Sequence, residues 1–460
     1  MKENLTKVKE KFNLENILCL YIVIQPIIDM LTSVCVRNIS PKLSLGILVR
    51  MIFMVFIVIY ALVKADKKDR IKILIYYILI AISIIVSSII SFKNYGTERI
   101  FTQAKGVVKI YYFPVVLVSL MAIFKQKEIK PKIKYLNIAT LIYGIVIILG
   151  VILDFGYTTY SDKNFSGTIG LFYAGNEIGA ILSILMPFIF ITFYSKEFKI
   201  YNIISAILIT YAILQIGTKT AFISAIGLLT LTTIIMVVKL FTKERKNIYK
   251  YFISSLAIIT TICLCINYIP AVKNLKNKVT EIQAETKEPS KIEQEPEIPL
   301  SEETKEENKS KSKTIINNIL SNRDVLYENA LEKYKSASLV SKIFGLGFVD
   351  RDVEEGIIER KMVEMDYCDI FFCLGIFGTI IYIVPFVIIV WIICKRFFKH
   401  FKQNIIDAKV LLNLYSILMG FAIALVAGHV FTAPAVSIFM IFSMFELLSL
   451  LKSKEEVYEK

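Results

Sequence analysis

Long hydrophobic segments follow one another along this chain, separated by shorter polar segments. Apolar runs of about twenty residues, the length that crosses a hydrocarbon core about 30 Å thick, recur from end to end between shorter polar connections. The pattern predicts twelve membrane-spanning helices. They cover Asn16–Cys35, Leu43–Val63, Ile73–Phe92, Val107–Phe124, Tyr135–Leu153, Ile178–Tyr194, Tyr201–Ile216, Ala221–Leu240, Tyr251–Ile269, Asp369–Cys394, Val410–Leu425 and Phe431–Leu451.

The amino-acid composition also indicates a membrane protein, and it points to no disulfide or metal site. Hydrophobic residues make up 55% of the chain and the mean hydropathy is +0.61, above the usual values of soluble domains. The first apolar run is long and lacks a small-residue cleavage site, so no signal peptide is expected. The seven cysteines lie mostly inside predicted spans without CxxC pairs or nearby histidines, and therefore predict neither disulfides nor a metal site. We expect an all-α, polytopic membrane protein.

Lysine and arginine are concentrated in every second connection, which indicates an orientation in the membrane. The N-terminus and the stretches "KADKKDRIK", "KQKEIKPKIK", "SKEFK", "KLFTKERKNIYK" and "KRFFKHFK" fall on one side of the predicted bundle. Short basic loops stay cytoplasmic, so both termini are predicted to face the cytoplasm. This signal accounts for most of the net charge of +15, and no nucleic-acid-binding module accompanies it. Nucleic acid is therefore not an expected partner.

The connection after the ninth span is much longer than the others and divides into two parts. Residues 270–313 include a stretch of Glu, Lys, Ser, Thr and Pro that cannot bury a core, and we expect a disordered extracytoplasmic spacer. Residues 314–366 should form a structured outer loop, with a helix that begins near Arg323 after a cap at Ser321 or Asn322. Residues 1–269 then hold nine spans, and residues 367–460 hold three spans and a cytoplasmic tail.

Several cations lie on the predicted outer side, against the orientation bias. Lys105 and Lys109 are four residues apart and share one helix face. Snorkelling toward lipid headgroups is the alternative for any one of these cations. Together they indicate a site for an anion, and a phosphate suits both ammonium and guanidinium groups. The predicted set is Arg99, Lys105, Lys109, Lys219 and Arg323.

Two further groups of polar residues lie near this side of the membrane. Asp29 and Arg50 should lie at similar depth in the first two spans, either as a structural ion pair or as part of a site. Asn176, at the start of the sixth span, could bond a substrate hydroxyl or cap its helix.

Four residues could handle a proton or orient a hydroxyl. His429 is one of two histidines and falls on the outer side, whereas His400 lies in a cytoplasmic basic loop. An imidazole, with an unperturbed pKa of about 6.5, could deprotonate a sugar hydroxyl beside cations that hold a leaving phosphate. It could instead be hydrogen-bonded at a helix end. In "EMDYCD", Glu364 and Asp369 could orient a base or a sugar hydroxyl, or could cap a helix. Asp366 or Asp369 could accept the proton in place of His429.

The order of several short motifs resembles the O-antigen ligase and polymerase superfamily, in the form seen in Gram-positive bacteria. The motifs are "YAGNEIGA", "IGTKTAFISA", "SNRDVLYENAL", "FGLGF", "LGIFG" and "AGHVFTAPAV", and they cover nearly the whole chain. The resemblance implies a metal-independent membrane glycosyltransferase with a family C architecture and no cofactor. Such an enzyme transfers a glycan from a polyprenyl-pyrophosphate carrier at the outer leaflet to an acceptor hydroxyl.

The resemblance also implies partners and roles. The partners would be the lipid-linked glycan, an acceptor glycan or lipid, membrane lipid and other polysaccharide assembly proteins. Lys105, Lys109, Lys219 and Arg323 would hold the pyrophosphate. Many ligases carry a catalytic histidine at the end of the large loop, where this chain has "EMDYCD", so His429 as the base is a hypothesis from this sequence alone.

Other classes of protein remain open at this stage. We expect a polymerase rather than a ligase, because nothing suggests an acceptor of the lipid A type. A transporter or a flippase of lipid-linked oligosaccharide is the main alternative, since twelve spans with both ends inside also occur in transporters. Such a protein should show internal repeats and polar residues near the midplane. A scaffold without catalytic activity would tolerate loss of the outer cations.

Overall fold

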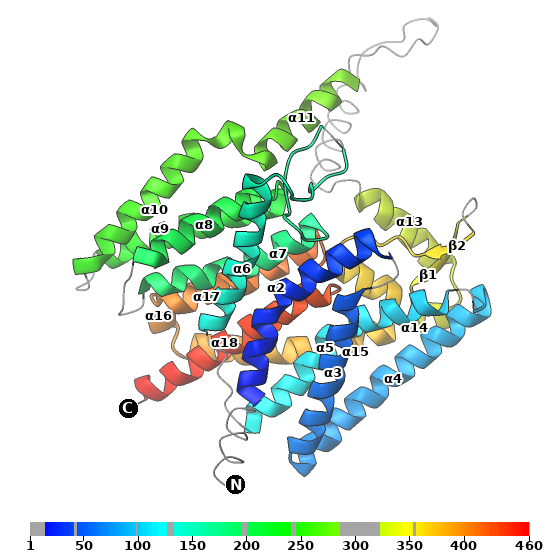
Figure 1. The fold of residues 1–460 in the computed structure, drawn as a ribbon. Coiled ribbons are helices and arrows are strands. Elements are labelled where there is room, and N and C mark those ends of the chain that lie inside the picture. The colour runs from blue at the N-terminus through cyan, green and yellow to red at the C-terminus, as the bar shows by residue number, and fades with distance from the viewer. Residues whose placement is uncertain are drawn as a thin grey trace, which may run out of the picture.

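The chain forms one bundle of helices with a small capping element (Figure 1). The structure is a computed structural model. It describes residues 14–40, 44–97, 99–126, 133–162, 164–194, 200–240, 245–285, 323–352 and 356–459. The Ser321 and Asn322 caps, and most of the expected spacer, therefore lie outside the described residues.

Long apolar helices dominate the part of the chain that is described. Nine of them are long and apolar enough to cross a membrane. They are α2 (Leu14–Asn38), α3 (Leu45–Lys64), α4 (Lys67–Tyr95), α5 (Ile100–Gln126), α6 (Ile133–Ile152), α9 (Lys219–Leu240), α15 (Asp366–Lys399), α17 (Ala408–Val426) and α18 (Pro434–Tyr458). This confirms the expected helical, polytopic membrane fold.

The other three predicted spans correspond to shorter apolar segments. They are α7 (Gly175–Ile191), α8 (Ile200–Gln215) and the second half of α10 (Arg245–Leu264). Each predicted run thus has its helix, while a count of twelve membrane crossings stays a prediction. Short 3-10 turns, η1 (Thr192–Tyr194) and η2 (Ile266–Tyr268), follow α7 and α10, and α16 (Phe401–Asn404) follows α15.

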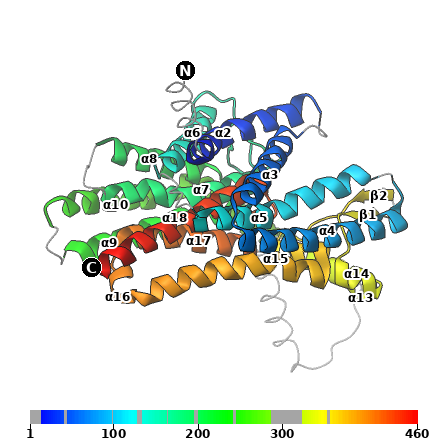
Figure 2. The same ribbon diagram turned by 90° about the horizontal axis from the view of Figure 1, so that it is seen from below.

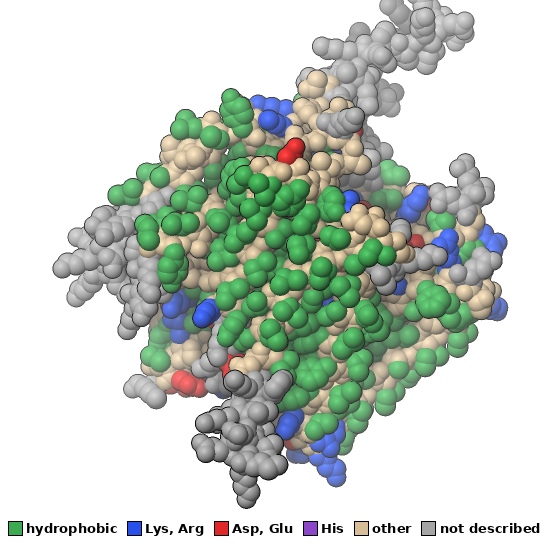
Figure 3. Space-filling view, in the orientation of Figure 1, with side chains coloured by type: hydrophobic (Ala, Val, Ile, Leu, Met, Phe, Trp, Pro, Cys, Tyr) green, Lys and Arg blue, Asp and Glu red, His purple; other side chains and the backbone are tan. Residues whose placement is uncertain are grey.

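Hydrophobic side chains also cover much of the outside of the bundle. Figure 3 shows a face on which green side chains form a nearly continuous layer, with Lys and Arg mostly toward its edges. Exposed large hydrophobic residues of the bundle include Ile52 and Ile59 of α3 and Ile78 of α4. A soluble protein would not leave so large an apolar face in water, whereas lipid tails solvate it. By contrast, α18 is the most buried of the long helices and lies in the middle of the bundle.

One end of the bundle carries a compact element that we call the cap, residues 323–352 and 356–365. It contains α13 (Arg323–Ser336), α14 (Leu339–Phe344) and an antiparallel hairpin of β1 (Val349–Asp352) and β2 (Gly356–Glu359). Figure 2 shows the cap at the end of the bundle where α15 begins. The helix predicted near Arg323 is present from Arg323, the first described residue of this segment. The hairpin was not expected from an all-α prediction, although it adds only two short strands.

Residues 270–285 correct the predicted boundary of the spacer. They form the helix α11 (Pro270–Glu285) rather than a disordered segment. Proline is well suited to the first helical position. Asn274 then ties the helix to two loops: its amide nitrogen donates to Ser166 O at 2.7 Å and Gly217 O at 3.1 Å. The polar composition of this segment therefore did not reveal the helix, which distant backbone groups stabilise.

The motif "FGLGF" docks into a break in α15. Gly375 has φ 66° and interrupts the helix, so carbonyl groups before it are left for other donors. Leu346 N donates to Phe372 O at 2.9 Å, and Gly347 N donates to Cys373 O at 3.2 Å. A Cβ at Gly345 would lie 2.1 Å from Cys373 O, so only glycine fits this approach. The two glycine motifs of the resemblance therefore meet and fix the cap to α15.

Candidate active site

A cavity of about 290 Å³ lies between the cap and the adjoining ends of the membrane helices. Its wall is assembled from α2, α3, α5, α7, the cap, the start of α15 and the loop from α17 to α18. The predicted site residues in this wall are Asp29, Arg50, Lys105, Lys109, Asp369 and His429. Segments more than 400 residues apart in sequence thus converge on one hollow.

Lys105 and Lys109 face this cavity from the second turn of α5 onward. Both side chains are half-buried, and neither makes an ion pair or hydrogen bond with any residue that the structure describes. Between them, Gly106 lets Phe348 of the cap pack directly on the helix, because a Cβ there would lie 2.2 Å from the Phe348 ring. Two unneutralised ammonium groups beside a closed aromatic wall favour an anionic ligand.

His429 lies in the same wall, in an unusual backbone conformation. Its φ is 62°, and neighbouring Gly428 and the contacting residue Glu364 also have positive φ values of 65° and 62°. A Cβ on Gly428 would lie 2.7 Å from Glu364 O, so these residues touch. Strained backbone of this kind persists where the surrounding structure holds it, and often does so at functional sites. The His429 imidazole has no hydrogen bond to any described residue and lines the cavity.

Asp366 holds the loop that presents His429. One carboxylate oxygen accepts from His429 N at 2.9 Å and Thr432 Oγ1 at 2.5 Å, and the other accepts from Val430 N at 2.8 Å and Phe431 N at 2.7 Å. The side chain is fully buried. This geometry argues against the expected role of Asp366 as a proton acceptor, because four donors already occupy its oxygens. We assign it a positioning role.

Asp369 is one helical turn further along α15 and does reach the cavity. Its Oδ1 accepts from Val363 N at 2.7 Å, and the backbone N–H groups of Glu364 and Met365 also interact with the carboxylate. It also lines a second hollow of about 240 Å³ beneath α13, together with Arg360 and Met362. Asp369 therefore lies in the partition between two adjoining cavities, where a carboxylate oxygen could accept from a sugar hydroxyl.

Arg323 and Glu364 pair with each other outside the cavity wall. Arg323 Nη2 donates to Glu364 Oε2 at 2.9 Å, and its Nε donates to Glu364 O at 3.0 Å. The guanidinium is buried and neutralised, so it is less suited to pyrophosphate than the sequence suggested. Glu364, expected to orient a base or hydroxyl, instead anchors α13 beside the loop of His429. Lys219 begins α9 and lies within electrostatic range of Arg323, also outside the cavity wall.

Arg99 and Asn176 are also placed differently from the prediction. Arg99 Nε donates to Ile357 O at 2.8 Å and so fastens the hairpin to the start of α5, away from the cavity. Asn176 lies in the first turn of α7 and does not line the cavity, whereas the next residue, Glu177, does. In the motif "YAGNEIGA", the carboxylate of Glu177 and not the amide of Asn176 therefore lies at the candidate site.

Asp29 and Arg50 form the expected ion pair, and both also line the cavity. Arg50 Nη2 lies 2.5 Å from Asp29 Oδ1 and donates to Gln25 Oε1 at 2.8 Å. The Tyr143 hydroxyl donates to Asp29 Oδ2 at 2.6 Å. The network joins α2, α3 and α6, and its two charged members line the cavity. The two charges pair with each other, although Arg50 Nε is buried without a hydrogen-bond partner among the described residues.

We predict that Arg50→Met destabilises the protein by about 3–5 kcal/mol, because Asp29 would stay buried without its counter-charge. The double variant Arg50→Met/Asp29→Asn should recover most of that loss, since it removes the orphaned charge. The measurement is thermal unfolding of the purified protein in detergent. Equal melting temperatures for the two variants would show that the ion pair is not the cause.

Some lining residues were not singled out from the sequence. Glu177, Glu359, Arg360 and Thr432 complete the polar wall. Arg360 is buried and bonds Asp350 Oδ2 at 3.0 Å and Gly347 O at 3.0 Å, so it braces the hairpin. The adjacent charged residues Glu359 and Arg360, just before "KMVEMD", could have indicated from the sequence that this segment contributes to the site. Two lysines beside several carboxylates suit a ligand with both phosphate and hydroxyl groups better than a bare phosphate.

A possible metal-binding group lies at the opposite end of the bundle. Among the described residues, His400, Glu455 and Glu459 have ligand atoms within 4.8 Å of one another. The Lys399 ammonium already bonds both carboxylates, at 2.6 Å from Glu459 Oε1. A bound ammonium competes with a metal cation for these oxygens, and the group is remote from the cavity.

The family of the chain follows from comparison with known proteins. Residues 9–454 match the model of the family described as O-antigen ligase like membrane protein. The chain belongs to this family, whose members are polytopic membrane proteins, and the match agrees with the resemblance of the sequence motifs. A search of curated proteins gives no match. Membership indicates a membrane enzyme that acts on lipid-linked glycans in polysaccharide ligation.

Proposed function

We propose that this protein is a polysaccharide polymerase or ligase that takes its glycan from a polyprenyl-pyrophosphate carrier. One observation carries the proposal: the unpaired Lys105 and Lys109 share a cavity with His429 and Asp369. Cations for a leaving pyrophosphate, a proton acceptor and hydroxyl-binding carboxylates are what such a transfer needs. We favour the polymerase, since no feature indicates a lipid A acceptor.

The proposed reaction is a displacement at the anomeric carbon of the lipid-linked sugar. The oxygen of the acceptor hydroxyl bonds to this carbon, and the bond from the carbon to the pyrophosphate oxygen breaks. The bonding electron pair leaves with the pyrophosphate, where Lys105 and Lys109 stabilise the added charge. The hydroxyl proton passes to His429, with Asp369 as the alternative acceptor. No step requires a metal or a cofactor.

The proposed topology follows from the two ends of the bundle. Among the described residues, the cap and cavity lie at one end of the bundle, and the basic helix ends at Lys64, Lys67 and Lys399 lie away from it. Since basic loops stay inside, both termini would be cytoplasmic and the cavity would open at the outer face of a bacterial membrane, in a Gram-positive cell. The cavity would then meet the carrier headgroup on the leaflet where the assembled glycan is exposed.

The experiment that tests this function is deletion of the gene in a cell that makes the polymer. We expect loss of long glycan and accumulation of lipid-linked repeat unit on the outer leaflet, measured by glycan length and by labelling of the repeat in intact cells. Accumulation on the inner leaflet would instead indicate a flippase. Unchanged polymer length with unattached product would indicate a ligase. Normal mature glycan would contradict the enzymatic proposal.

A further inference from the structure

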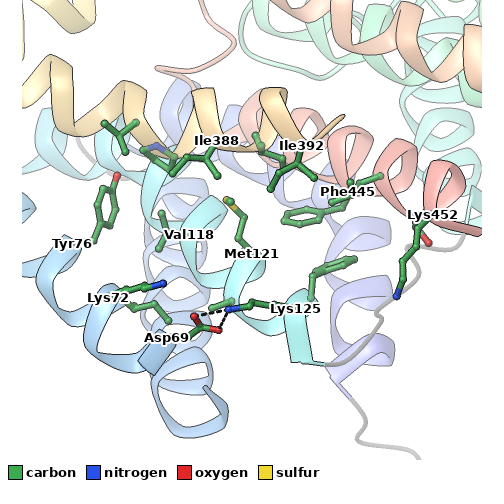
Figure 4. Close-up of a pocket in the computed structure, with 18 of the residues that line it drawn as sticks. Asp69, Lys72, Tyr76, Val118, Met121, Lys125, Ile388, Ile392, Phe445 and Lys452 are labelled. Carbon is green, nitrogen blue, oxygen red and sulfur yellow. Dashed lines mark hydrogen bonds and ion pairs between the residues drawn. The ribbon is translucent and has the colours of Figure 1, made fainter. Parts of the chain in front are cut away.

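A separate cavity of about 630 Å³, larger than the two beside the cap, lies at the other end of the bundle between α4, α5, α15 and α18. It shares no lining residue with the candidate active site. Its walls are apolar and are drawn from all four helices. Figure 4 shows Val118 and Met121 of α5 facing Ile388 and Ile392 of α15, with Phe445 of α18 beside them. Such a volume is typical of a site for a hydrophobic ligand.

Charged side chains line one side of this cavity. Four of them are cationic, Lys72, Lys125, Arg396 and Lys452, and the single lining carboxylate is Asp69. Lys125 Nζ bonds both oxygens of Asp69, at 2.7 and 2.6 Å, as the dashed lines in Figure 4 show. That pair neutralises itself and joins the start of α4 to the end of α5. Apart from Asp69, the lining holds no carboxylate to balance Lys72 and Arg396, and Glu455, which acts electrostatically on Arg396, lies outside it.

Arg396 supplies an independent sign of a missing partner. Its Nη1 is buried and has no hydrogen-bond partner among the residues that the structure describes. A buried guanidinium donor without an acceptor is costly, and native proteins rarely leave one unsatisfied. Lys72 is exposed and makes no ion pair with any described residue. An anionic group at the mouth of the cavity would accept a hydrogen bond from Arg396 Nη1 and pair with the Lys72 ammonium group.

We propose that this cavity binds an acidic phospholipid. An acyl chain would lie between α5 and α15 against Met121 and Ile388, and the phosphate would lie at Lys72, Arg396 and Lys452. Basic pockets between transmembrane helices bind acidic headgroups, and lipids of this class are enriched in the cytoplasmic leaflet. The basic connections place this end of the bundle on the predicted cytoplasmic side. The site is separate from the glycan-transfer cavity and does not depend on its proposed role.

The test compares lipids that differ only in the headgroup. Purified full-length protein in detergent is titrated with phosphatidylglycerol, with phosphatidylcholine of the same acyl chains, and with glycerol phosphate, and bound ligand is counted by native mass spectrometry. We expect phosphatidylglycerol to bind more tightly than phosphatidylcholine and glycerol phosphate not to bind. Equal affinities for the two lipids, or equally tight binding of glycerol phosphate, would overturn the proposal.

Matched variants separate the charge from the cavity. The double variant Lys72→Gln/Arg396→Gln should lower the affinity for phosphatidylglycerol about 25-fold, because each lost cation lowers it about fivefold. The control Lys68→Gln/Lys395→Gln removes two cations of the same helices that do not line the cavity and should bind normally. Met121→Trp fills the cavity without changing charge and should weaken both lipids. Equal loss in the control pair, or full binding by Met121→Trp, would contradict a lipid held in this cavity.

Discussion

The double variant Lys105→Ala/Lys109→Ala is expected to lose glycan transfer by roughly 1,000-fold or more, because each donor to a developing anion contributes about 10²–10³ in rate. Both ammonium groups face the cavity without a carboxylate partner among the described residues, so the leaving pyrophosphate is the charge they would stabilise. The loss should appear as short glycan and accumulated lipid-linked repeat unit in cells.

The matched control is Lys93→Ala. Lys93 lies in the last turn of α4 at the same end of the bundle, is exposed, and does not line the cavity. It should leave polymer length unchanged. Lys219→Ala should have a much smaller effect than the double variant, since Lys219 also lies outside the wall. Wild-type polymer in the double variant, with the protein present at its normal level, would refute the assigned role of the two lysines.

Replacing His429 by asparagine is expected to lower the rate of transfer by about 10²–10⁴, the usual contribution of a general base. Asparagine is the appropriate replacement because it tolerates the positive φ of 62° at this position better than most residues do. The imidazole has no described hydrogen-bond partner, so its removal should leave the melting temperature nearly unchanged. The measurement pairs transfer by purified protein with thermal unfolding.

Two comparisons show whether the effect belongs to His429 itself. His400→Asn changes the other histidine, at the opposite end of the bundle, and should keep full activity. Asp366→Asn should lower both activity and melting temperature, because the amide group cannot accept all four hydrogen bonds that the carboxylate accepts. If His429→Asn transfers glycan normally and Asp369→Asn does not, the proton acceptor is Asp369.

Features that depend on neighbours in sequence were predictable. Lys105 and Lys109 lie four residues apart on one helix, so their shared face follows from helical geometry alone. The helix near Arg323 follows from local spacing in the same way. Asp29 and Arg50 belong to adjacent spans, and counting residues from the membrane edge was enough to place them at one depth.

Features that depend on distant backbone groups were not predictable. The carboxylate of Asp366 is occupied by amide groups about 65 positions later, and no spacing rule reveals such partners. Arg323 is paired with Glu364 rather than free, because the cap folds α13 back against the start of α15. Adjacent residues on a helix point in different directions, and the sequence alone does not show which residue of "YAGNEIGA" faces the cavity. The prediction chose Asn176, whereas Glu177 lines the cavity.

The most direct measurement of the central claim is an experimental structure of the protein with polyprenyl pyrophosphate bound. The proposal predicts the diphosphate within hydrogen-bond reach of the Lys105 and Lys109 ammonium groups, on the side of the cavity shared with His429 and Asp369. A diphosphate held elsewhere, for example at Lys219 and Arg323, with the cavity between α5 and the cap left to other contents, would contradict it.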